Sequence, residues 1–436
     1  MIRSFVLFVL SAAFVAAQAS DKHDALDPAF EKIPLDQWLG ERGKAHFRMT
    51  ASVSHAELSF HQRLISRVVI IVDGRDLANR PRNGELLFLV QITDSAGTRY
   101  QNHGNIELNK LAENTKAVNV EYGFTAFLLP GSYRLAVAVL DTATGEHSAI
   151  QEQFRVAAPQ LDWLRDTWRD LPPIEFIGKA ESPDSWYLPD IHGRLEWAAS
   201  GHSPARLNII LNVAPSVPAP GSHHAPSGEM AALLPTLKAI SEAGSSSISE
   251  HVEVLDLARR NAVFHQDEVQ DLDWPQLKTS LGEANTASID VHSLSERHHD
   301  AQFFVSEVRK VLRASDKPDR PCVLVVLTNP VAFESGEDLV PISLEALPAC
   351  RVIYIRVHAP VERVRPAEQM GGRGRGGRMG GGMARTRRSM EPLDQLEATL
   401  KPLSPKVFDV ETPEQMTKAL AEIEKALLAS KGQSSR

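Results

Sequence analysis

Short apolar segments separated by turn signals make up the chain between residues 48 and 156. Residues 68–72 and 86–90 are continuous runs of Val, Ile, Leu and Phe, and Asp73-Gly74 and Pro130-Gly131-Ser132 mark turns. After the second turn, apolar side chains occupy every other position, at Tyr133, Leu135, Val137 and Val139. Because this region shows no helical period, the pattern predicts an all-β sandwich over residues 48–156.

From residue 206 onward, apolar strands alternate with segments of helical period. The strand-like segments are residues 207–211, 252–257, 262–264, 289–294, 323–327, 352–355 and 407–408. The helical segments are residues 230–240, 274–281, 304–311 and 413–427. The last helix has a capping-box start signal, in which Thr412 precedes Pro413 and Gln415. The alternation predicts a C-terminal α/β domain over residues 206–430, built on a doubly wound, mostly parallel sheet.

The remaining segments complete a predicted multi-domain organisation. Residues 1–19 are predicted to be a signal peptide, 20–47 an N-terminal extension, 157–205 a connector and 431–436 a tail. Within the connector, four large apolar side chains fall at helical spacing, at Leu161, Leu164, Trp168 and Leu171. This spacing predicts a helical stripe that packs onto a neighbouring domain.

The N-terminus has the three parts of a secretory signal. Arg3 precedes an apolar run over residues 5–15, and Ala17-Gln18-Ala19 fits a cleavage site. An uncleaved anchor is the alternative, but the run is shorter than the ~20 residues that span a bilayer. We therefore expect an exported protein, periplasmic or extracellular, with no transmembrane span in the mature chain.

Export changes what is expected of the two cysteines. Cys322 opens one predicted core strand and Cys350 immediately precedes the next. If these strands are neighbours, the two side chains meet at one sheet edge, and an oxidising compartment permits a disulfide. Two buried free thiols are the alternative.

Charge is unevenly distributed along the chain. Lys and Arg number 47 against 55 Asp and Glu, a formal net charge of −8 that gives no chain-wide case for nucleic-acid binding. Residues 362–388, in contrast, contain eight arginines and two glutamates among many glycines, which predicts a flexible loop over residues 360–391. A weak contact with a polyanion is one interpretation of this loop, and a solvated linker is the other. The anion-binding candidates are Arg365, Arg373, Arg375, Arg378, Arg385, Arg387 and Arg388.

The motifs that would indicate catalysis are weak. Gly372, Gly374 and Gly377 fit G-x-G-x-x-G, but they lie in the Arg/Gly loop instead of a strand-to-helix turn. The histidine pairs at residues 223–224 and 298–299, the latter beside Asp300 and near His292, have no further ligand at a suitable spacing. We therefore expect no catalytic residues, no cofactor and no metal.

Residues 206–430 resemble a von Willebrand factor type A domain, and the whole arrangement is similar to secreted bacterial VWFA-related proteins. The preceding segment from residue 128 to 156 resembles the last strands of immunoglobulin-like or fibronectin-like modules. In the type A family, an Asp-x-Ser-x-Ser motif after the first strand and an Asp after a later strand hold a divalent metal. Here the first motif reads Asn212-Val213-Ala214-Pro215-Ser216, and Asn329 stands at the later position.

These substitutions imply a degenerate metal site. Mg²⁺ prefers oxygen ligands that include carboxylates, whereas Asn212 and Asn329 offer neutral amides, Ala214 offers nothing and only Ser216 keeps its hydroxyl. The resemblance therefore favours an exported, non-enzymatic protein–protein interaction module whose partner is another, unidentified protein. One alternative is a metal-dependent adhesion domain with unrecognised ligands. The other is an envelope enzyme with an undetected site.

Overall fold

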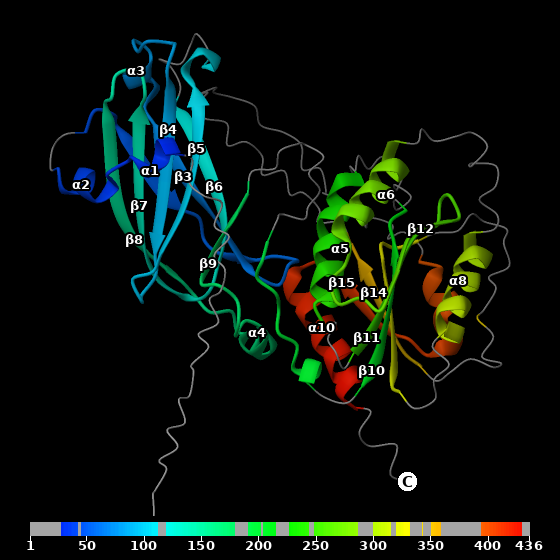
Figure 1. The fold of residues 1–436 in the computed structure, drawn as a ribbon. Coiled ribbons are helices and arrows are strands. Elements are labelled where there is room, and N and C mark those ends of the chain that lie inside the picture. The colour runs from blue at the N-terminus through cyan, green and yellow to red at the C-terminus, as the bar shows by residue number, and fades with distance from the viewer. Residues whose placement is uncertain are drawn as a thin grey trace, which may run out of the picture.

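Three β-sheets form the framework of the protein in a computed structural model (Figure 1). The structure describes residues 28–41, 45–111, 119–178, 191–201, 204–214, 226–243, 248–286, 300–314, 320–331, 342, 350–358 and 394–429. Within these residues, fifteen strands are present.

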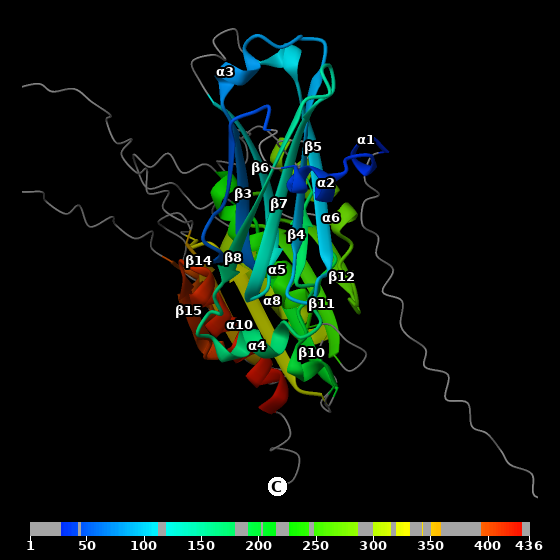
Figure 2. The same cartoon turned by 90° about the vertical axis from the view of Figure 1, so that its left-hand side faces the viewer.

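Two antiparallel sheets form the N-terminal unit, and their strands run alongside one another in Figure 2. The first has the order β1-β3-β6-β9, with β2 paired to β3. Its strands are β1 (Met49–Val53), β2 (Glu57–Leu58), β3 (Leu64–Val72), β6 (Val120–Leu128) and β9 (Ile174–Ile177). The second has the order β5-β4-β7-β8, with β4 (Glu85–Thr93), β5 (Arg99–Glu107), β7 (Gly131–Asp141) and β8 (His147–Val156). The short helix α3 (Gly74–Leu77) follows β3.

Strand β4 is apolar on both faces because both faces are covered. Phe88, Val90 and Ile92 point into the core between the two sheets, where Phe88 stacks on Tyr122 with ring centroids 4.5 Å apart. The alternate positions, Leu87 and Leu89, pack against the N-terminal helices α1 (Pro28–Glu31) and α2 (Leu35–Gly40). The predicted N-terminal extension thus covers the outer face of the second sheet.

The C-terminal unit is a six-stranded sheet with helices on both faces. Its order is β12-β11-β10-β13-β14-β15. The strands are β10 (Ala205–Asn212), β11 (Ile248–Asp256), β12 (Asn261–Asp267), β13 (Cys322–Thr328), β14 (Cys350–Val357) and β15 (Lys406–Val410). The helices are α5 (Pro226–Ser241), α6 (Trp274–Thr286), α8 (Asp300–Ala314), α9 (Leu396–Leu400) and α10 (Pro413–Leu428).

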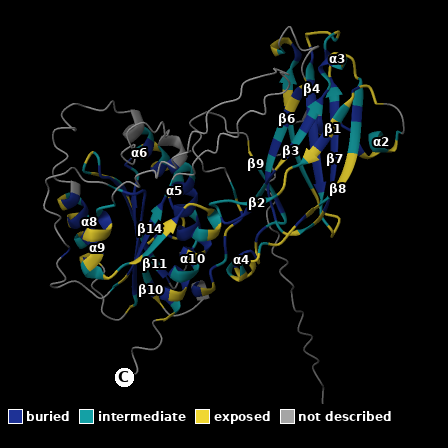
Figure 3. Ribbon diagram, turned by 180° about the vertical axis from the view of Figure 1, so that it is seen from behind, coloured by how far each residue is buried: buried dark blue, intermediate teal, exposed yellow. Residues whose placement is uncertain are grey.

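Alternation along the strands decides which helices cover which face. Leu207, Ile209 and Leu211 of β10 belong to the core under α5, α6 and α10. Ile210 points the other way, into a second core under α8 and α9. Burial on both faces explains why β10 and β13 are nearly continuous apolar runs. Figure 3 shows buried strand segments in dark blue between the helices of this unit.

The prediction of a doubly wound, mostly parallel α/β fold class is wrong. The chain as a whole is dominated by strands, two of its three sheets are antiparallel, and the third sheet is mixed because β12 pairs antiparallel with β11. The reason is the length of the connection between these two strands. Residues 257–260 form a four-residue turn, which closes a hairpin, whereas a parallel crossover needs a dozen or more residues.

Several local predictions are confirmed. Thr412 caps α10 in a complete capping box with Gln415. The predicted helical stripe of the connector is helical only over α4 (Asp162–Thr167), which contains Leu164. Trp168 and Leu171 are buried beyond the end of α4, and Leu161 is half-buried before it begins. The predicted strand at residues 289–294 lies outside the described residues.

The connector joins the two units through buried polar contacts. Trp168 Nε1 donates to the Gln62 carbonyl oxygen at 2.8 Å, and Thr417 Oγ1 of α10 donates to Gln62 Oε1 at 2.6 Å. Glu424 of α10 accepts from Trp163 Nε1 at 2.8 Å. One continuous apolar cluster accordingly runs from the sandwich through α4 and Trp197 to α5 and α10.

Among the described residues, every helix is too short or too polar to cross a bilayer.

Candidate functional site

The order of the six-stranded sheet reverses at β10. The chain passes from β10 to β11 on one side and later to β13 on the other side. In open α/β sheets, ligands bind outside the carboxyl ends of the strands at such a reversal. Asn212 ends β10, Thr328 ends β13 and Asn329 directly follows it, so these three residues mark the candidate site.

The Asn212 side chain is buried and is held by three groups of the protein itself. Its Nδ2 donates to Thr328 Oγ1 at 2.9 Å. Its Oδ1 accepts from the backbone N–H groups of Ala214 at 3.0 Å and Leu257 at 3.3 Å. Asn212 therefore ties together the ends of β10, β11 and β13.

Asn329 is equally buried and brings a carboxylate into the site. Its Nδ2 donates to Glu229 Oε2 at 3.0 Å, and Glu229 lies in the first turn of α5. The Asn329 Oδ1 atom is buried with no hydrogen-bond partner among the described residues. Sequence reasoning missed Glu229 because a helical residue carries no strand-end signal. The only available signal was an acidic side chain in the first turn of the helix that follows β10.

Of the other predicted metal-motif positions among the described residues, Ala214 reaches this site through its backbone N–H alone. Ala214 is buried in the core under α8 and α9, and it offers no ligand atom. Ser216, all seven candidate arginines and the three glycines of the loop lie outside the described residues, as do the histidine pairs at residues 223–224 and 298–299.

Cys322 and Cys350 are joined by a disulfide at the opposite edge of the sheet. They face each other in the register of β13 and β14, with Cα atoms 4.6 Å apart. Both cysteines open their strands, so the bridge lies at the amino edge, away from Asn212 and Asn329. The disulfide therefore cross-links β13 to β14 and makes no contact with the candidate site.

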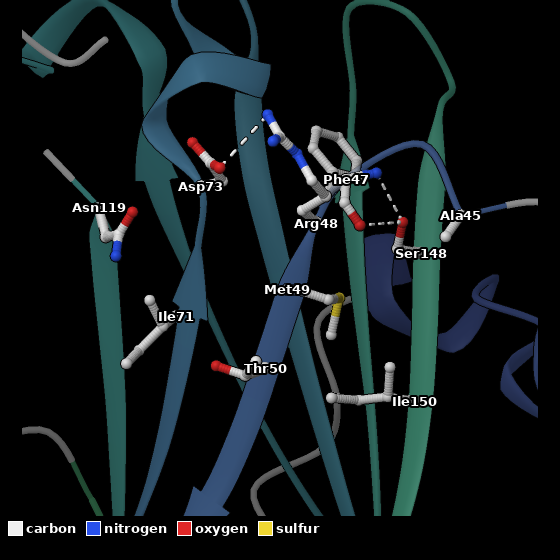
Figure 4. Close-up of a pocket in the computed structure, with 10 residues that line it drawn as sticks. All are labelled: Ala45, Phe47, Arg48, Met49, Thr50, Ile71, Asp73, Asn119, Ser148 and Ile150. Carbon is white, nitrogen blue, oxygen red and sulfur yellow. Dashed lines mark hydrogen bonds and ion pairs between the residues drawn. The ribbon is translucent and has the colours of Figure 1, made fainter. Parts of the chain in front are cut away.

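A groove of ≈ 450 Å³ lies between β1 and β8, the edge strands of the two antiparallel sheets (Figure 4). Met49, Ile71 and Ile150 supply apolar surface, and Arg48 pairs with Asp73 across 3.2 Å. Hydrogen bonds from the Arg75 side chain and backbone lower the pKa of Asp73 to about 2. The groove thus contains a fixed ion pair on an apolar floor, and this arrangement provides no acid or base near neutral pH.

A second polar cluster lies on the β11–β12 hairpin. It consists of His251 and Glu253 on β11 with His265 and Asp267 on β12. This cluster was not predicted, because the histidine candidates in the sequence were pairs of adjacent residues, whereas residues that share one face of a strand are two positions apart. The signal was present as two His-x-carboxylate pairs in strand-like segments.

Comparisons with known proteins give no family. No family model matches the chain. No curated protein matches it either. Among solved structures, a structural-genomics target shares 17% identity at a TM-score of 0.18 and covers 26% of this chain and 88% of its own. A "Putative ApaA Protein from Bordetella pertussis" shares 16% identity at a TM-score of 0.17, covering 26% of this chain and 96% of its own. Likeness at this level carries no argument about fold or function.

Proposed function

We propose that this chain is an exported, non-enzymatic module that binds another protein at the carboxyl edge of the six-stranded sheet. The observation that carries the proposal is the bonding of Asn212, whose amide group contacts Thr328, Ala214 and Leu257. A buried amide engaged by three groups of its own chain acts as a brace between strands, and it leaves no lone pair directed at a ligand.

The charges at this edge support binding without a metal ion. Mg²⁺ is held mainly by carboxylate oxygens, and each missing carboxylate removes one compensating charge. Asn212 and Asn329 supply dipoles, and the Glu229 carboxylate is bonded to the Asn329 amide. A second carboxylate at this edge, Asp256, is paired with Arg259 at 2.9 Å. Carboxylates that are already bonded to an amide and to an arginine favour recognition by shape and polar contacts over a metal–carboxylate bridge.

The turn at residues 257–260 is the part of this edge that we assign to the partner. It leaves β11 directly beside Asn212, because Leu257 donates its N–H to the Asn212 side chain. Arg259 is exposed, and its guanidinium is oriented by Asp256 at 2.9 Å. Arginine held in this way is a common anchor in protein–protein interfaces.

Photo-crosslinking from this turn tests the proposal. A photoreactive amino acid in place of Asn261, the exposed residue that directly follows this turn, should capture one dominant protein partner in the native host, with equal yield in magnesium and in EDTA. The matched control places the same amino acid at Arg351, an exposed position at the amino edge of β14, where capture of that partner should be absent.

Two outcomes would count against this function. Capture that requires magnesium and disappears in Glu229→Gln would favour the metal-dependent adhesion domain. Equal capture from positions 261 and 351 would remove the carboxyl edge as the binding surface.

The Arg/Gly loop supports a second, weaker interaction with polyanions. We expect replacement of all its arginines between residues 365 and 388 by serine to abolish retention on heparin at low salt. The melting temperature should stay nearly unchanged, because this segment has little apolar surface to bury. Heparin chromatography and differential scanning calorimetry measure the two effects, and retention that survives the replacement would refute the contact.

A further inference from the structure

Four side chains with metal-binding chemistry share one face of the β11–β12 hairpin. His251 lies directly opposite Asp267, and Glu253 lies directly opposite His265 in the antiparallel register. Residues two apart on a strand point to the same face, so the four positions form a two-by-two array. The neighbouring Leu255 belongs to the core under α8, which places the array on that side of the sheet.

Three of these side chains already bring their donor atoms together. The Nδ1 atom of His251 lies 2.7 Å from one carboxylate oxygen of Asp267, and the Nε2 atom of His265 lies 2.9 Å from the other. All three donor atoms lie within 4.8 Å of one another. In a tetrahedral zinc shell, bonds of about 2.0–2.1 Å place ligand atoms about 3.4 Å apart, so small side-chain rotations suffice.

Glu253 occupies the position of a supporting carboxylate. Its side chain is fully buried, and Lys310 of α8 holds its Oε1 atom at 2.8 Å. Its Oε2 atom lies 3.8 Å from His251 Nε2, and both atoms are buried without a hydrogen-bond partner among the described residues. A histidine that ligates a metal through one ring nitrogen commonly donates the other N–H to a carboxylate, which orients the ring. Two unpartnered buried atoms facing each other here match that arrangement.

The charges around the array also suit a divalent cation. Lys310 is bonded to Glu253 and to Glu307, and Asp267 adds a third carboxylate. With neutral imidazoles, these ion-paired groups carry more negative than positive charge. Imidazole nitrogens combined with a carboxylate select zinc and similar transition metals over magnesium or calcium.

We propose that His251, His265 and Asp267 bind one zinc ion, that Glu253 orients the His251 ring, and that the fourth coordination position opens to solvent. His265 and Asp267 are 45% and 68% exposed, which provides the entry path. The site lies on an edge hairpin of the sheet, apart from Asn212 and Asn329, and it is independent of the function proposed above.

Zinc titration of the untagged, full-length, EDTA-treated protein tests this site. By isothermal titration calorimetry, the wild-type protein should bind one more zinc ion per chain than His265→Ala. The matched control His55→Ala, which removes an exposed histidine from a sandwich loop, should retain wild-type stoichiometry. Glu253→Gln should keep the three zinc ligands but weaken zinc binding about 10- to 100-fold, because the carboxylate that orients His251 and adds negative charge beside the site is lost.

Two further readouts separate ligation from folding. Without metal, His265→Ala should melt at the wild-type temperature, and zinc should raise the melting temperature of the wild type alone. Cobalt should give the visible absorption of tetrahedral coordination in the wild type and lose it in His265→Ala. Equal zinc stoichiometry and equal cobalt spectra in the two proteins would overturn the site. Wild-type affinity in Glu253→Gln would overturn the role of that carboxylate.

Discussion

Replacing Trp197 by alanine should lower the free energy of unfolding by about 3–5 kcal/mol, the cost of removing a large aromatic side chain from a core. Trp197 is only 2% exposed and is one of the largest fully buried side chains of the protein. Its ring meets Trp163 edge-on at 5.3 Å, and its Nε1 donates to the Ala239 carbonyl oxygen of α5 at 3.2 Å. Alanine leaves a cavity at this position.

Because of the location of Trp197, the Trp197→Ala variant also tests whether the two units of the chain unfold together. It belongs to the apolar cluster that includes the sandwich, α5 and α10. Because the two units share this core, we expect them to unfold in one cooperative transition that moves as a whole. Urea denaturation followed by far-UV circular dichroism and by tryptophan fluorescence measures both the shift and the coincidence of the two signals.

Trp38 provides the matched control. It is half-buried on α2, where it stacks on His147 at 3.9 Å at the periphery of the sandwich. We expect Trp38→Ala to cost about 1 kcal/mol, the typical value for a point substitution. An effect of Trp197→Ala no larger than that of Trp38→Ala would contradict the shared core, as would two separate transitions of which only one shifts.

Local signals along the chain were sufficient for individual elements. The run at residues 68–72 forms part of β3, and that at residues 86–90 forms part of β4. The capping box at Thr412 and Gln415 starts α10 where predicted. These predictions succeed because apolar periodicity and capping depend on residues a few positions apart.

The pairing of strands depends on residues far apart in the sequence and on the length of the connection between them. The predicted fold class was wrong because apolar periodicity does not report this pairing. The alternation of strands and helices suggested parallel crossovers, but the turn at residues 257–260 is short enough only for a hairpin. The same limit applies to the contact between the two units. Gln62 and Thr417 form a hydrogen bond although they are 355 positions apart in the sequence, and no local pattern around either residue predicts the other.

The candidate sites also contain residues that local patterns predict and residues that only the tertiary structure brings together. Asn212 and Asn329 were predicted as the motif positions that the type A resemblance places at the ends of two apolar strands, whereas Glu229, the partner of Asn329, comes from a helix. The histidines of the hairpin were missed because the register that places His251 opposite Asp267 is a property of the pairing and not of either strand alone.

Removing the disulfide should lower the free energy of unfolding by about 3–4 kcal/mol in the chain-entropy model. Cys322 and Cys350 are separated by 28 positions, and the bridge limits the freedom of that loop in the unfolded chain. In the folded protein the two residues are already register partners on adjacent parallel strands. The folded sheet therefore keeps its pairing when the bridge is absent, and the loss falls mainly on the unfolded state.

The double variant Cys322→Ala/Cys350→Ala and the reduced wild-type protein should lose the same amount of stability in urea denaturation. The reduced protein keeps both sulfur atoms, including the Cys322 Sγ that accepts from Asn208 Nδ2 at 3.3 Å. Agreement between the two therefore assigns the loss to the cross-link and not to packing or to this contact. A larger loss in the double variant alone would place the effect in the core of β13. Two free thiols in the mass spectrum of the non-reduced protein would contradict the bridge itself.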